Sequence, residues 1–97
     1  MAFIDDVKAR LRISQTKLDG DLASTIAAAR AELVRIGVNP TLATSESDPL
    51  IVEAVKTYCQ HGFTDDEKAR EGYWSSWVTQ VDGLRKSEMY KRSDDAE

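Results

Sequence analysis

The fold is decided by residues 50–90, LIVEAVKTYCQHGFTDDEKAREGYWSSWVTQVDGLRKSEMY. Asp48 and Pro49, directly before this stretch, supply an N-cap and a first-turn proline for a helix. Apolar side chains then recur at helical spacing as far as Gly62, where we expect the helix to end. The sequence Thr64–Glu67 fits a capping box, which predicts that a second helix begins there. Residues 50–90 are therefore predicted to form an antiparallel helical pair.

The second helix of this pair carries one broad apolar stripe at helical period, and such a face needs a packing partner. The stripe comprises Tyr73, Trp74, Trp77, Val78, Val81 and Leu84. Gly72 and Gly83 interrupt the helix, and each costs up to about 1 kcal/mol relative to alanine. We expect a close helix approach at Gly72. Near Gly83 we expect a bend or an early end, so that residues 84–90 form a separate turn.

The N-terminal half predicts two more helices. Apolar residues spaced three and four apart from Phe3 to Leu11 predict a short helix that ends near residues 12–13. The amphipathic pattern of residues 18–36 predicts a long central helix, with Gly37 as its C-terminal stop. Residues 38–47 have no helical period and are expected to form a loop.

These elements predict an all-α fold, a small bundle of about four helices followed by a short terminal helical turn. A chain of 97 residues suits one domain, because so short a chain rarely supports two independent cores. We assign residues 1–90 to this domain. Residues 91–97 are polar and charged and are expected to form a flexible tail.

Composition restricts the function. The net charge of −4 and the pI of about 5.0 argue against a protein whose main task is to bind nucleic acid, because phosphate binding relies on clustered lysine and arginine. One cysteine cannot form an intramolecular disulfide, and no N-terminal apolar run is long enough for a signal peptide or a membrane span. We therefore expect a protein of the reducing cytoplasm with no membrane partner.

The sequence offers little for catalysis. A single histidine, His61, excludes a histidine-based metal cluster, and no glycine-rich phosphate loop or nucleophile motif is present. The acidic pairs Asp5–Asp6 and Asp65–Asp66 stand where helices begin, and the positive end of the helix dipole explains them. Cys59 lies on an apolar helix and is expected to be a buried small hydrophobe. We predict a protein that is not an enzyme and needs no metal or cofactor.

The order of these elements supports a more specific interpretation. In AVKTYCQHGFTDDEKAREGYWSSWVTQVDGLRKSEMY an apolar helix ends at a hinge in which Gly62 precedes Phe63. An acidic helix start, a Tyr- and Trp-containing helix with a late leucine, and a Ser–Glu–Tyr-like end at residues 87–90 follow. This order resembles the C-terminal half of the phage head-tail connector (adaptor) proteins, although that family most often has the glycine of the hinge after the aromatic residue. Their first helix carries an element similar to Val7, Lys8, Leu11 and Arg12, so the resemblance spans residues 3–90.

The resemblance implies a structural virion protein of a tailed phage or prophage that acts in DNA packaging and virion assembly. In that family about twelve copies form a homo-oligomeric ring whose head-to-tail contacts close by rotation. The implied partners are the portal protein, a stopper or tail-completion protein, and DNA that passes through the channel without sequence-specific binding. The implied location is the head-tail junction of the virion, after assembly in the host cytoplasm.

Five residues are candidates for the interface: Trp74, Trp77, Arg85, Met89 and Tyr90. The two tryptophans are three residues apart on one side of a helix, and either core packing or an exposed anchor explains them. The other three match the terminal segment of the family. Two alternatives remain open at this stage, a small helical nucleic-acid-binding protein and a host-directed protein that binds one partner through an aromatic patch.

Overall fold

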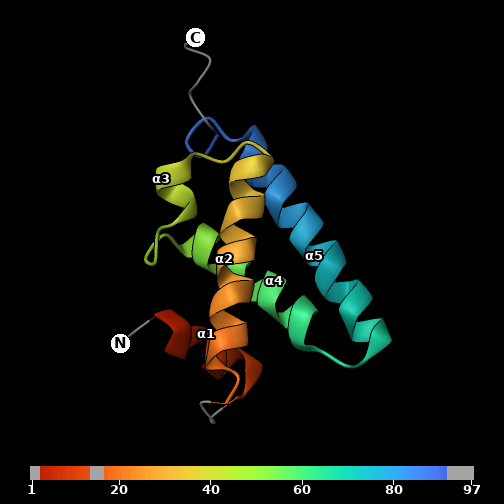
Figure 1. Ribbon diagram of the computed structural model, residues 1–97. Helices are drawn as coiled ribbons and strands as arrows, with labels where there is room; N and C mark the ends of the chain where they lie inside the picture. The colour runs from red at the N-terminus through yellow and green to blue at the C-terminus, as the bar shows by residue number, and fades with distance from the viewer. Residues whose placement is uncertain (1–2, 14–16, 92–97) are drawn as a thin grey trace.

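Five helices follow one another in the computed structural model, which describes residues 3–13 and 17–91 (Figure 1). They are α1 (Phe3–Leu11), α2 (Asp19–Arg35), α3 (Pro40–Ala43), α4 (Pro49–Phe63) and α5 (Glu67–Lys86). These ranges contain no strand, and one isolated antiparallel bridge joins Val38 to Lys91. The predicted all-α fold is confirmed, with one short helix added to the four expected. Of the predicted tail, only Lys91 belongs to the described residues.

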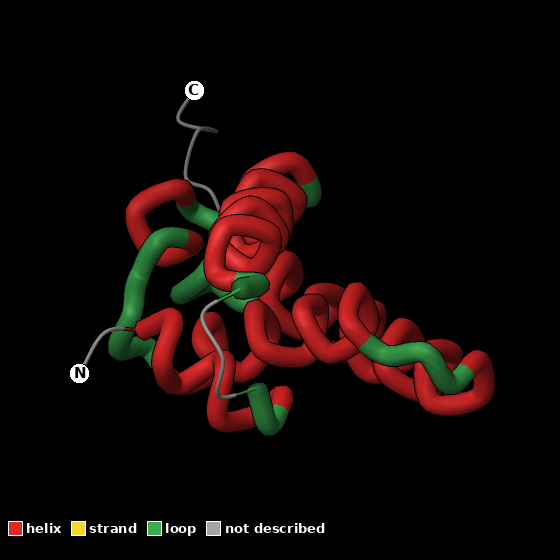
Figure 2. Tube along the Cα trace, turned by 60° about the horizontal axis from the view of Figure 1, so that its bottom comes forward, coloured by secondary structure: helices red, strands yellow, loops and turns green. Residues whose placement is uncertain are grey.

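Helix α4 lies at the centre of the arrangement. It pairs along its length with α5, and α2 and α1 pack against its other sides, whereas α3 packs on α2. The α4–α5 hairpin projects beyond the other helices at its turn, as Figures 1 and 2 both show. The molecule consequently has a flattened, elongated shape, with extents of 45 × 30 × 18 Å.

The core lies where α2, α4 and α5 turn their apolar sides inward. Its members follow the predicted helical spacing and include Leu22, Ile26 and Leu33 of α2, Ile51, Val55 and Cys59 of α4, and Trp77, Val81 and Leu84 of α5. Phe3 and Val7 of α1 complete it from the N-terminal side. Helix α1 has only nine residues and would be marginal in water alone, so this packing is what stabilises it.

Two helices end in the same hydrogen-bond arrangement. At the end of α2, the N–H of Gly37 donates to the carbonyl of Val34 (3.1 Å) and the N–H of Val38 donates to the carbonyl of Leu33 (2.9 Å). This is a Schellman motif, and Gly37 adopts the positive φ of 112° that it requires. The predicted helix stop at Gly37 is therefore confirmed. Helix α1 ends in the same way, but Arg12 occupies the glycine position with φ of 62°.

The predicted loop over residues 38–47 contains helix α3, so the expectation of a loop without helix is wrong there. Asn39 caps α3: its Oδ1 accepts hydrogen bonds from the N–H groups of Thr41 (2.8 Å) and Leu42 (3.4 Å). Pro40 occupies the first helical position. This is the same cap-and-proline signal that starts α4 at Asp48, but only one turn follows it, too short for helical periodicity to be visible in the sequence.

The turn of the hairpin also differs from the prediction. Helix α4 continues through Gly62 to Phe63, because Gly62 keeps helical geometry and lies against α2, where an added Cβ would stand 3.6 Å from Cγ2 of Thr25. The predicted capping box does not form. Helix α5 begins at Glu67 without a side-chain cap, and Thr64 instead ends α4, its carbonyl accepting a hydrogen bond of 2.8 Å from Arg70.

Both glycines of α5 lie in regular, open helix. A Cβ built at Gly72 or Gly83 would meet no atom within 4 Å. The expected close approach at Gly72 is therefore absent among the described residues, and α5 neither ends nor breaks at Gly83 but runs to Lys86. The separate turn predicted for residues 84–90 is confined to residues 87–91, where the N–H groups of Tyr90 and Lys91 donate to the carbonyl of Ser87.

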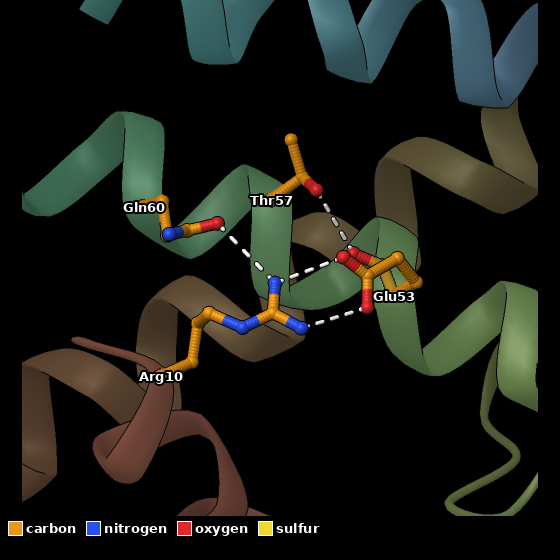
Figure 3. Close-up of polar contacts among 4 residues, drawn as sticks. All are labelled: Arg10, Glu53, Thr57 and Gln60. Carbon is orange, nitrogen blue, oxygen red and sulfur yellow. Dashed lines mark hydrogen bonds and ion pairs between the residues drawn. The ribbon is translucent and has the colours of Figure 1, made fainter. Parts of the chain in front are cut away.

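A polar bridge fixes α1 to α4 (Figure 3). The Arg10 guanidinium donates two hydrogen bonds to the Glu53 carboxylate, at 2.9 and 2.8 Å, and a longer one of 3.4 Å to Oε1 of Gln60. This bidentate bond raises the pKa of Arg10 and lowers that of Glu53. Its partners lie 43 residues apart in the sequence, so the bridge ties the N-terminal helix to the α4–α5 hairpin.

Candidate assembly surface

The five candidate interface residues divide into two groups. Trp77 and Tyr90 are buried within the chain, with 2% and 8% of their surface exposed. Trp74 and Met89 are exposed, at 46% and 72%, and Arg85 is exposed as well. The structure therefore places Trp74, Arg85 and Met89 where a partner can reach them, and it places the other two in the core.

Trp77 packs at the centre of the α4–α5 pair. Its ring meets Tyr58 edge-on, with ring centres 4.9 Å apart and planes at 66°. This is a favourable aromatic geometry, and it explains why Trp77 lies inside although Trp74, one turn earlier, does not. Of the two explanations open for the tryptophan pair, core packing holds for Trp77.

Tyr90 attaches the terminal turn to the start of α4. Its hydroxyl lies 3.0 Å from both carboxylate oxygens of Asp48, and its carbonyl accepts a hydrogen bond of 2.7 Å from the N–H of Asn39. The same Asp48 carboxylate caps α4 by accepting from the N–H groups of Leu50 (3.1 Å) and Ile51 (3.2 Å). Burial, and then the hydrogen bond to Asp48, raise the pKa of Tyr90. Tyr90 thus has a structural partner inside its own chain.

An apolar knob, formed by Trp74 and Val78, stands out from one side of α5. Both side chains are 46% exposed, and they lie one helical turn apart. The Trp74 ring rests against His61 of α4, with ring centres 5.0 Å apart, which holds it near one orientation. The indole N–H has no hydrogen-bond partner among the described residues. Sequence analysis placed both residues on the stripe but could not tell that they lie at its exposed edge.

A second feature, the hairpin groove, lies between the start of α4 and the end of α5. It is a mainly apolar depression of about 340 Å³. The principal lining residues are Leu50, Glu53, Gln80, Gly83, Leu84 and Tyr90. Leu50 is 56% exposed, and Oε1 of Gln80 is buried without a hydrogen-bond partner among the described residues. The helical spacing of the apolar residues before Gly62 did not distinguish Leu50 from its buried neighbours, so the groove was not predicted, although Gly83 in an otherwise regular helix marks its position.

Charges gather at the last turn of α5. Asp82 forms ion pairs with Arg85 (2.8 Å) and Lys86 (3.0 Å), and these contacts, the hydrogen bond from Lys86 first, lower the pKa of Asp82. All three side chains are in contact with water, so the pairs contribute little to stability. Cations at this position complement the negative end of the helix dipole. Arg85 is exposed and is held by Asp82 at this end of α5.

The described residues contain no cluster of His, Cys, Asp and Glu side chains that could hold a metal ion. Cys59 is buried, and desolvation raises the pKa of its thiol to about 12, so it is a thiol and not a reactive thiolate at neutral pH. None of the helices in the described part of the chain has the length and apolar character needed to cross a bilayer.

Comparison with known proteins identifies the family. A family model described as phage connector protein matches residues 3–82, which is most of the chain and includes four of the five helices complete. The chain belongs to the phage connector protein family. Neither the curated proteins nor the solved structures contain a significant match. Membership implies a structural role as a connector between phage head and tail and a location in the virion.

The family match ends at Asp82, within α5. Trp74 and Trp77 fall inside the matched region. Arg85, Met89 and Tyr90 follow it, so the roles assigned to them from the terminal segment of the connector family have no support from the match. Among the residues within it, Trp74 is the exposed aromatic side chain that remains a candidate for a contact between connector subunits.

Proposed function

We propose that this connector protein is a ring-forming subunit at the head-tail interface of a tailed phage or prophage. The ring of about twelve copies docks on the portal protein, continues the DNA channel toward the tail, and presents its far side to a stopper or tail-completion protein. Its role is geometric, and it needs neither turnover nor a cofactor.

The observation that carries the proposal is the family match over residues 3–82, joined to the exposed apolar surface of the hairpin. Leu50, Trp74, Val78 and Met89 are large apolar side chains left in water by a chain that is otherwise well packed. Large apolar side chains left exposed on a small domain mark protein interaction sites where they gather, as Trp74 and Val78 do one helical turn apart on α5. A subunit designed to be covered by neighbouring copies explains why these four residues are not polar.

The charge of the chain suits a channel protein. With a net charge of −4, the subunit repels DNA at long range, and a ring of such subunits lets DNA pass without retaining it. The nucleic-acid-binding alternative is weaker, because Asp65, Asp66 and Glu67 stand exposed at the start of α5. A helix that entered a DNA groove from this end would bring carboxylates against phosphates.

The proposal is tested by removing the gene from the phage genome and examining the particles by electron microscopy. We expect separate heads and tails and no infectious virions, with joining restored when the protein is supplied from a plasmid. Intact, infectious virions in the absence of the protein would refute the proposed role at the head-tail interface.

A further inference from the structure

The apolar knob and the hairpin groove lie on opposite sides of the same helix. Trp74 and Val78 are separated by 40° around α5, at about 100° per residue, so they form one projection. Gly83, at the open side of the groove, follows Trp74 by two and a half helical turns and therefore faces away from it. A chain with a projection on one side and a depression on the other can contact identical copies on both sides at once.

The two features also match in chemistry. The groove is mainly apolar and contains one buried acceptor without a partner, Oε1 of Gln80. The indole of Trp74 is a large apolar group with a single polar atom, an N–H that can only donate. Rotation of the Gln80 amide about its terminal bond, which has a broad energy profile, directs the oxygen toward an incoming donor. The volume of the groove, equal to that of about eleven water molecules, suffices for one indole and part of a second side chain.

We propose that the Trp74–Val78 knob of one connector subunit inserts into the hairpin groove of a second copy, beside Leu50 and over Gly83. This inference rests on the proposed ring function and identifies the surface through which neighbouring subunits meet. The contact is heterologous: each copy contributes its knob to one neighbour and its groove to the other. Such contacts close into a ring when the rotation between neighbours allows it, whereas a two-fold symmetric contact would stop at a dimer.

The positions of the two features also predict the orientation of the hairpin in the ring. The groove centre lies about 10 Å further along α5 than the knob, at a rise of 1.5 Å per residue. If α5 ran parallel to the ring axis, each copy would be raised by this amount and the assembly would form a spiral. Closure therefore requires α5 to be inclined to the ring axis.

Glycine provides a specific way to block the groove. A Cβ at Gly83 meets no atom within 4 Å, so the backbone has room for a side chain there, and Gly83→Leu adds one to the groove. Gly72 is a matched control, since it lies in the same helix, is equally open and does not line the groove. Trp74→Ala removes the knob. Far-UV circular dichroism should show unchanged helix content for Gly83→Leu, Gly72→Leu and Trp74→Ala.

Sedimentation velocity of wild type and variants, alone and with the portal protein, tests the inference. We expect Trp74→Ala and Gly83→Leu each to raise the concentration for half-assembly at least about tenfold, and Gly72→Leu to behave as wild type. An equimolar mixture of Trp74→Ala and Gly83→Leu should form one-to-one dimers and nothing larger, because it contains only one complete knob-and-groove pair.

Three results would overturn the inference, and they are distinguishable. If the wild type forms rings and Gly83→Leu or Trp74→Ala assembles as well as Gly72→Leu does, the knob and groove are not the contact, although the proposed function stands. If the wild type stays monomeric alone and with the portal protein, the ring itself is refuted. Loss of portal binding by Trp74→Ala with self-assembly intact would assign the knob to the portal protein and would also refute the contact between copies.

Discussion

Replacing Tyr90 with phenylalanine isolates the hydrogen bond that holds the terminal turn. The hydroxyl donates to the Asp48 carboxylate from 3.0 Å, and a hydrogen bond to a charged group contributes about 1.5–3 kcal/mol. Asp48 is partly exposed and keeps its two amide donors, so water can replace the hydroxyl at modest cost. We therefore expect the lower limit, a loss of about 1.5 kcal/mol in the free energy of unfolding. Phenylalanine retains the packing of the buried ring.

The assay is urea unfolding followed by far-UV circular dichroism. With a slope of about 1.5 kcal/mol per molar urea, the loss corresponds to a fall of about 1 M in the midpoint. Tyr58→Phe is the control, because the hydroxyl of Tyr58 has no hydrogen-bond partner among the described residues, and we expect it to change little. A double-mutant cycle of Tyr90→Phe with Asp48→Ala should give a coupling energy close to the full 1.5 kcal/mol. A coupling energy below about 0.3 kcal/mol would refute the reasoning.

The same bond gives a pH dependence. Because burial and the Asp48 carboxylate raise the pKa of Tyr90 in the folded state, folding favours the neutral phenol. The stability that the neutral phenol of Tyr90 contributes is complete below about pH 10, the ordinary pKa of tyrosine. This stability is lost as pH rises through the higher pKa that Tyr90 has in the folded state. Between about pH 10 and the pKa of Tyr90 in the folded state, the free energy of unfolding of the wild type should fall more steeply with pH than that of Tyr90→Phe. Parallel curves for the two proteins would contradict the assignment.

Three further substitutions test other parts of the account. Trp77→Ala should cost about 3–5 kcal/mol in urea unfolding, because it empties the centre of the α4–α5 packing; a loss under 1 kcal/mol would mean that Trp77 is not core. Arg12→Gly should raise the thermal midpoint, with a gain of about 0.5–1 kcal/mol, because glycine relieves the positive φ at the end of α1; a decrease would contradict this. Glu53→Gln should lose stability near neutral pH by up to about 1 kcal/mol. Because Arg10 lowers the pKa of Glu53, the difference from wild type should vanish as pH falls below about 4, as acid titration of unfolding can check.

The boundaries of the helices could be predicted from the sequence where a capping residue stands next to apolar residues at helical spacing. Asp48 and Pro49 mark the start of α4 and Gly37 the end of α2, and the structure places both boundaries at these residues. Helix α3 was missed because its cap, Asn39, is followed by only one turn. Gly62 was assigned as a stop, but it does not adopt the positive φ of a glycine helix end and lies inside α4, which ends at Phe63.

The candidate surface could be predicted only in part. Helical spacing alone places Trp74 and Trp77 on one apolar stripe of α5. Which of the two is buried depends on contacts with another helix, where Trp77 meets Tyr58 of α4. The Arg10–Glu53 bridge and the Tyr90–Asp48 bond were beyond prediction for the same reason, since each joins residues more than 40 positions apart. Long-range pairs of this kind leave no local pattern in one sequence, whereas helix caps do.

Native mass spectrometry of the purified protein, alone and with the portal protein of the same phage, tests the central claim most directly. The account predicts a closed species of about twelve copies, formed in solution or on the portal, with no series of intermediate lengths that would indicate an open filament. A strict monomer in both conditions would contradict the claim.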